Sequence, residues 1–258
     1  MTLRYRLLSV FALATASVAS AHLTYTNRDF GALSETVTTI STQTVSGSSG
    51  WADATDADFG DSHRGRAFRF HLHDPATIRI VVQRNALGTG PLNTFLPAFS
   101  IYAGLASGAP EQPPHDGAPL SIASRPLGTE GSTLSLADWS MGNDETYNVP
   151  ADPLSGILFP ARLSLFTYVG HAADGSSANF GSAPGISGDG LADGFVSGTF
   201  NLDHGDYTLW VGGANYGGQL SEGPTTFPTF GITVSAGINP LPVPAKTTTW
   251  SRVKSLYR

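Results

Sequence analysis

The chain of 258 residues contains no cysteine, which excludes a disulfide framework, a thiolate zinc site and a cysteine nucleophile. Charge is also sparse, because Asp, Glu, Lys and Arg make up only 13% of the residues, where about a quarter is usual. The hydrophobic fraction of 40% is nevertheless sufficient for a folded core, so the composition is not that of a disordered chain.

Lysine is absent from residues 22–245, which hold 8 arginines and 20 acidic residues and therefore carry a net charge of −12. An acidic body of this kind disfavours nucleic acid as a partner. It favours a cationic partner or bound metal ions instead.

The first 21 residues have the pattern of a secretory signal peptide. Arg4 and Arg6 precede a short apolar run over residues 7–16, and Ala19-Ser20-Ala21 is a small-x-small cleavage signal. The mature chain is then expected to begin at His22 and to be exported to the periplasm, the cell surface or the medium. After Ala21 no run of 18 apolar residues occurs, so no membrane-spanning helix is predicted.

The remaining sequence is typical of an all-β protein. Short runs rich in β-branched and aromatic residues alternate with clusters of Gly, Pro, Asn and Asp. Together they predict one antiparallel β-sandwich, jelly-roll-like, over residues 22–236, with long Gly/Asp-rich loops near residues 104–119 and 170–194. The predicted strands are residues 36–45, 67–73, 77–83, 98–103, 162–169, 195–200, 207–212 and 230–235.

Two local predictions accompany this pattern. Asp74-Pro75-Ala76 separates two strand-like runs and predicts a β-hairpin between residues 67–73 and 77–83. Residues 134–139 form the best helical candidate, with Ser132 or Thr133 as the cap.

Four carboxylates within nine residues, Asp53, Asp56, Asp58 and Asp61, predict a calcium loop, because calcium prefers six to eight oxygen ligands. The spacing is not that of an EF-hand. Counted from Asp56, Gly60 occupies the fifth position, where an acidic residue is required, and the twelfth position holds no Glu. A solvated acidic loop is the alternative interpretation. Asp189 and Asp193 form a second, weaker loop of this type, and residues 143–145 a third.

The seven histidines offer a competing metal site. His71 and His73 lie two apart on a predicted strand and therefore share its outward face. Two such imidazoles can share one copper or zinc ion, and His63 is a further candidate ligand. Arg69 on the same face disfavours another cation, and two solvated histidines are the alternative interpretation.

His22 would combine an α-amino group and an imidazole after signal cleavage, a pair that chelates copper well. In this one feature the chain resembles lytic polysaccharide monooxygenases. It is also similar in kind to the copper-binding surface proteins that methanotrophs export. That resemblance implies histidine ligands together with a Trp-derived one, for which Trp51, Trp139 and Trp210 are available.

The C-terminus carries a further resemblance. Residues 240–245 read Pro-Leu-Pro-Val-Pro-Ala and resemble the start of a PEP-CTERM-type sorting tail of exported bacterial proteins, although residues 246–250 replace the anchor helix. Residues 237–258 are therefore interpreted as a Pro-rich basic tail. Residues 99–102 and 201–212 resemble strands of secreted pre-peptidase-type β-sandwich modules.

The sequence favours a non-enzymatic binding or structural protein with calcium in acidic loops. The first alternative is a copper-binding surface or periplasmic protein that uses its histidines. The second is a protein that binds or cleaves extracellular polysaccharide around Asp138, Trp139 and Asp144. No nucleophile elbow, zinc-protease signature or nucleotide-binding motif is present.

Overall fold

The computed structural model of the chain describes residues 23–46, 64–106, 114–115, 133–143, 163–175, 186–187, 191–215 and 228–239. These parts consist of strands, their connections and one short 3-10 turn, η1 (Leu92–Thr94), without an α-helix. They therefore include no helix of the length and hydrophobicity needed to cross a membrane.

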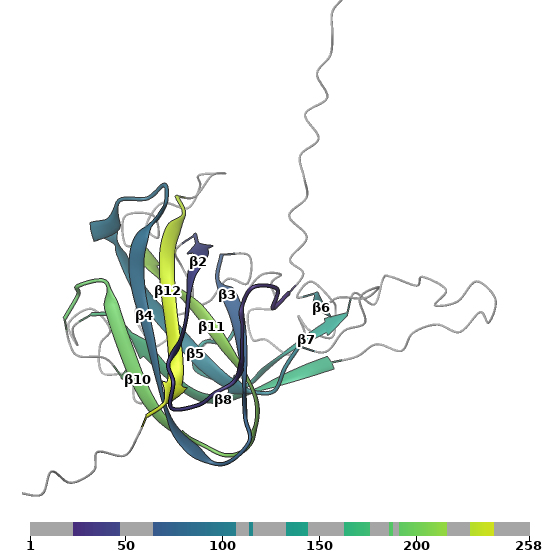
Figure 1. Cartoon of the computed structure of the whole chain (residues 1–258). Coiled ribbons are helices and arrows are strands. Elements are labelled where there is room, and N and C mark those ends of the chain that lie inside the picture. Colours follow the sequence, from purple (N-terminus) through teal and green to yellow (C-terminus); the bar gives the residue numbers. More distant parts are fainter. Residues whose placement is uncertain are drawn as a thin grey trace, which may run out of the picture.

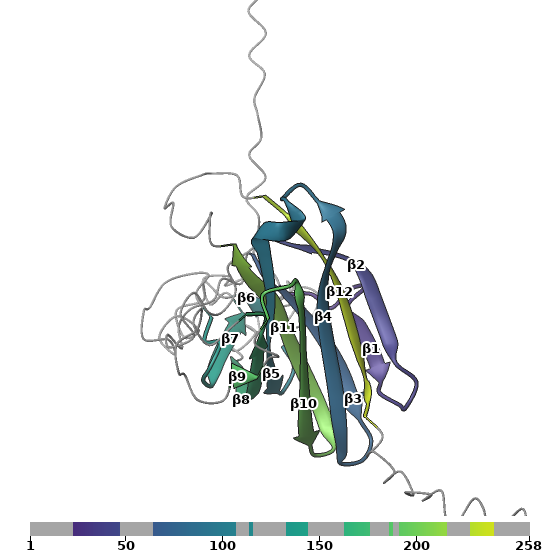
Figure 2. The same ribbon diagram turned by 90° about the vertical axis from the view of Figure 1, so that its left-hand side faces the viewer.

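The strands form two sheets that pack face to face (Figures 1 and 2). The smaller sheet has the order β10 (Phe195–Leu202), β4 (Ala76–Gly88), β12 (Phe230–Ile238) and β2 (Thr38–Val45). The larger sheet has the order β1 (Asp29–Ala32), β3 (Arg66–Leu72), β11 (Gly205–Asn215), β5 (Phe95–Ala103), β8 (Leu163–Ala173), β7 (Trp139–Asn143) and β6 (Pro114–His115). β9 (Ile186–Ser187) pairs with β8 outside this order. The described strands pair antiparallel, except that β1–β3 and β8–β9 are parallel.

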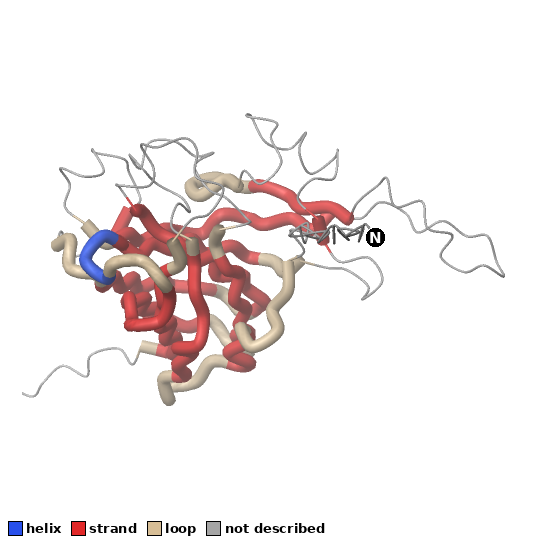
Figure 3. The backbone as a smooth tube through the Cα atoms, turned by 90° about the horizontal axis from the view of Figure 1, so that it is seen from above, coloured by secondary structure: helices blue, strands red, loops and turns tan. Residues whose placement is uncertain are grey.

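The main core lies between the two sheets, where alternate side chains of facing strands meet. β3 contributes Phe68, Phe70 and Leu72, each no more than 2% exposed, and β4 contributes the fully buried Ile78, Ile80 and Val82. This period of two is what a strand with one face on the core requires. The predicted all-β sandwich is confirmed, and Figure 3 shows from above that strands make up most of the described body.

The predicted hairpin between β3 and β4 is wrong. β3 pairs with β1 and β11, whereas β4 pairs with β10 and β12, so the chain crosses from one sheet to the other at residues 73–75. In a hairpin the two apolar faces would lie side by side on one sheet, whereas here each strand turns its apolar face to the core from its own sheet. The same crossing recurs between β10 and β11, at residues 203–204.

The larger sheet also buries part of its outer face, because Ala67, Tyr102, Trp139, Phe166 and Trp210 gather there. The ring centres of Trp139 and Phe166 are 4.7 Å apart in a stack, and those of Trp139 and Trp210 are 5.6 Å apart edge to face. Such aromatic pairs stabilise a core beyond their buried area.

The helix predicted over residues 134–139 is also wrong. Residues 133–138 are irregular, with a bend at residues 135–137, and Trp139 begins β7. The bend holds Leu134 against the aromatic cluster, and the backbone oxygens of Leu134 and Ser135 accept hydrogen bonds from Tyr102 and Ser100. These tertiary contacts outweigh a weak helical propensity.

β8 continues to Ala173, beyond the predicted strand end at residue 169. At Gly170 an added Cβ would come within 2.5 Å of the Phe200 ring, so this residue permits close packing between the sheets. Glycine here marks a close approach within a strand rather than the start of the predicted loop.

The alternation along β4 makes a testable prediction. Ile80→Ala should lower the free energy of unfolding by about 2–5 kcal/mol, because the side chain is fully buried between the sheets. Its neighbour Val81 points to the other face and is only partly buried, so Val81→Ala should cost less. Chemical denaturation of both variants measures the difference, and equal losses would contradict this orientation of β4.

Candidate metal site

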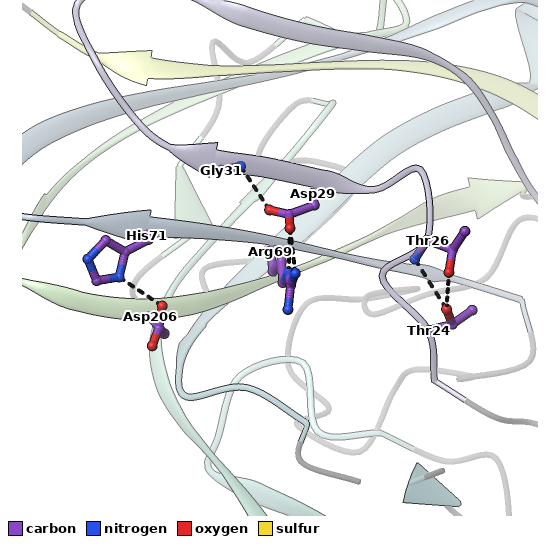
Figure 4. Close-up of polar contacts among 7 residues, drawn as sticks. All are labelled: Thr24, Thr26, Asp29, Gly31, Arg69, His71 and Asp206. Carbon is purple, nitrogen blue, oxygen red and sulfur yellow. Dashed lines mark hydrogen bonds and ion pairs between the residues drawn. The ribbon is translucent and has the colours of Figure 1, made fainter. Parts of the chain in front are cut away.

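The outer face of the larger sheet brings together polar side chains from β3, β11 and β1, beyond the aromatic cluster. His71 of β3 lies directly opposite Asp206 of β11, and Arg69 lies opposite Thr208. Asp29 of β1 pairs with Arg69 in the parallel register. Figure 4 shows His71 with Asp206 and Arg69 with Asp29 side by side on neighbouring strands.

β3 ends at Leu72, so His73 lies in the bend that follows the strand and not on the strand itself, where the sequence predicts it. The ring centres of His71 and His73 are nevertheless 4.7 Å apart at an interplanar angle of 74°. A metal–nitrogen bond of about 2.0 Å places an ion roughly 3 Å from each ring centre. Two imidazoles in adjacent positions on one ion would then have centres roughly 4.4–5 Å apart, and opposite positions would need roughly 6 Å. The observed separation therefore suits two adjacent ligands.

Asp206 orients the first of these rings. The Nδ1 atom of His71 lies 2.8 Å from Asp206 Oδ1, and a carboxylate can only accept, so Nδ1 carries the proton and donates. Nε2, on the other side of the ring, is then the basic nitrogen that can bind a metal. A carboxylate on the second nitrogen is the common companion of a metal-binding histidine.

Arg69 is held in place next to His71. Its Nε atom donates to Asp29 Oδ2 at 2.7 Å, and its guanidinium lies 5.5 Å from the centre of the Tyr25 ring. Partial burial alone would raise the pKa of Asp29. Hydrogen bonds from Arg69 and from the Gly31 backbone N–H, together with the positive charge of Arg69, outweigh this effect, so the pKa lies below its usual value. Asp29 is thus favoured as the anionic partner of this arginine.

Seven of the ten residues predicted as metal ligands lie outside the described residues: His22, Asp53, Asp56, Asp58, Asp61, His63 and Asp189. Within the described ranges no three His, Asp or Glu side chains are placed to hold one metal ion together.

Asp193 takes part in a turn at the start of β10. Its Oδ1 accepts from the Phe195 N–H at 3.1 Å, and its own N–H donates to Asp174 Oδ1. Asp174 also accepts from the Gly194 N–H at 2.6 Å. Burial raises the pKa of Asp174 to about 6, although these two N–H groups and Arg84 oppose the rise. The described contacts of Asp193 are those of a turn residue.

Asp138 and Trp139 do not form the open sugar site that the sequence suggests. Trp139 is 3% exposed and its indole is packed among Tyr102, Phe166 and Trp210, so it offers no free face to a sugar ring. Asp138 Oδ1 accepts a hydrogen bond of 2.7 Å from the Tyr168 N–H. Asp144, the third residue of this hypothesis, lies outside the described residues.

His171 of β8 is a buried polar residue that the sequence did not single out. Its Nδ1 lies 2.8 Å from Ser100 Oγ, whose hydroxyl donates to the Ser135 carbonyl, so the imidazole N–H donates to the serine oxygen. The residue is 1% exposed, and burial lowers its pKa to about 3. A neutral histidine in this position joins β8, β5 and the bend before β7.

Comparisons with known proteins show likeness in fold alone. No protein-family model matches the chain, and no curated protein matches it in sequence. Among solved structures, CorA of Methylomicrobium album BG8, described as a surface-associated copper-binding protein important in copper acquisition, is 14% identical. The match covers 84% of this chain and 99% of that one, with a TM-score of 0.48.

A mercury-soaked structure of MopE, a secreted protein of Methylococcus capsulatus, is 16% identical and matches with a TM-score of 0.45. That match covers 82% of this chain and 87% of the other. In MopE an oxidized tryptophan is described as facilitating copper binding.

Proposed function

We propose that the protein is an exported, non-enzymatic copper-binding protein that holds the ion on His71 and His73. The observation that carries the proposal is the geometry of this pair, with ring centres 4.7 Å apart and His71 oriented by Asp206. Export rests on the predicted signal peptide of residues 1–21.

The ligand types favour copper over the calcium that the acidic loops suggest. Imidazole nitrogen binds first-row transition metals, and copper(II) is bound most tightly among the divalent ions of that row. Calcium requires a shell of oxygen ligands, which a histidine pair does not supply. The two histidines would leave coordination positions open to solvent or to a second ligand.

Copper titration of the mature, untagged chain tests this function. The double variant His71→Ala, His73→Ala should weaken copper binding at least about 100-fold. This exceeds the usual loss when a residue that only hydrogen-bonds to a metal ligand is removed. His204→Ala is the matched control, because this exposed histidine lies in the neighbouring turn and should leave the affinity unchanged. A double variant that binds one copper with wild-type affinity would contradict the proposal and direct attention to His22.

Replacing Asp206 should change the copper affinity only through the orientation of the His71 ring. Asp206→Ala removes the hydrogen-bond acceptor that orients the imidazole and should weaken copper binding about 10-fold to 100-fold. Asp206→Asn keeps an acceptor and should fall between this variant and the wild type. If Asp206→Ala binds copper as the wild type does, His71 is not oriented for the metal in the way proposed.

A further inference from the structure

A pocket of about 340 Å³ opens beside the proposed copper site. His71 and Asp206 line one part of it, and Arg69 with Asp29 lines another. The backbone of β1 at Gly31 and Ala32, with Phe70 and Leu105, completes the wall. The pocket is large enough for a small organic molecule next to the histidine pair.

Arg69 gives this pocket a fixed positive group. Its two contacts with Asp29, through Nε at 2.7 Å and Nη2 at 2.5 Å, go to the same carboxylate oxygen, and neither of them uses Nη1. The side chain remains 43% exposed. Arginine recognises carboxylates well because its planar fork presents several donors in a rigid arrangement.

This arginine makes the site less favourable for a bare divalent ion. Residues two apart on a strand face are about 6–7 Å apart, so Arg69 places a positive charge close to an ion held by His71. With Asp29 and Asp206 the pocket carries a formal charge of −1, which matches a singly positive copper(II) complex. A copper ion that brings its own carboxylate would turn the repulsion by Arg69 into attraction.

We propose that the site takes copper(II) as a complex with a small amino-carboxylate chelator, whose carboxylate lies against Arg69, in preference to the bare ion. This inference rests on the proposed copper site. Copper(II) favours four tetragonal ligands. The two histidines supply adjacent positions, and a chelator with one nitrogen and one oxygen fills the other two.

Two copper(II) complexes, a singly positive one with a carboxylate and a doubly positive one without it, test the inference on the mature full chain. Copper(II) glycinate and copper(II) ethylenediamine, each at one chelator per copper, both leave two positions for histidine, but only glycinate carries a carboxylate. We expect the wild type to prefer the glycinate complex in calorimetric titration. Arg69→Gln should reduce the preference for the glycinate complex about fivefold, as expected for a half-exposed ion pair. The same variant should bind bare copper(II) more tightly.

Arg79→Gln on β4 of the smaller sheet is the control and should leave the preference unchanged. Arg69→Lys retains the charge without the fork and should reduce the preference about twofold, which serves as the test if Arg69→Gln does not fold. An unchanged preference in either Arg69 variant, with copper still bound through His71 and His73, would overturn the chelate inference alone. Wild-type binding by the double histidine variant would overturn the copper site itself.

Discussion

Acidification from pH 7 to pH 4 should destabilise the wild-type protein relative to a His171→Asn variant by on the order of 3 kcal/mol. Burial lowers the pKa of His171 to about 3, whereas an unfolded histidine has its ordinary pKa of 6.5. Between these values the unfolded state binds a proton that the folded state does not. The unfolding free energy therefore falls as the pH falls through 6.5.

Asparagine is the informative replacement because its side-chain amide can still donate to Ser100 Oγ, as His171 Nδ1 does. Urea denaturation at pH 7, 6, 5 and 4 would give the two pH profiles. Parallel profiles for wild type and His171→Asn would show that His171 is not buried in its neutral form.

Asp174 should have the opposite effect to His171: its protonation should raise the free energy of unfolding as the pH falls. Burial raises its pKa to about 6 from an ordinary value of 3.8, so between these values the folded state binds the extra proton. The stability contributed by this protonation is fully present below pH 3.8 and is lost as the pH rises through 6. Relative to Asp174→Asn, the wild type should therefore gain stability on acidification from pH 7 to pH 4.

The variant should also be less stable at low pH, because asparagine keeps one acceptor where Asp174 accepts from both Asp193 and Gly194 N–H groups. An unsatisfied buried donor costs about 1–3 kcal/mol. The same denaturation series measures both effects. A wild type that loses stability relative to Asp174→Asn on acidification would contradict the raised pKa.

The strands of the sandwich could be predicted from sequence because their periodicity reflects burial directly. In β11, Leu209 and Val211 are buried between the sheets while Thr208 and Trp210 are buried on the outer face, as the alternation indicates. The sequence could not show which strands pair. The turn at residues 73–75 fits a hairpin and a crossing between sheets equally well, and only the packing of both apolar faces decides between them.

The site was predictable in part for the same reason. The spacing of His71 and His73 predicts that their rings lie close together, as they do, although His73 follows the end of β3. Asp206 is 135 residues away in sequence, and its position opposite His71 depends on the register between β3 and β11. β1, which supplies Asp29, has only Phe30 buried and so gives almost no periodic signal.

Pulsed electron paramagnetic resonance of the copper(II)-loaded mature chain tests the central claim most directly, because it counts the imidazoles bound to the ion. We expect the signature of two imidazoles in the wild type, of one in His73→Ala, and of none in the double variant with His71→Ala. An imidazole signature that persists unchanged in the double variant would show that copper binds elsewhere and would contradict the assignment to His71 and His73.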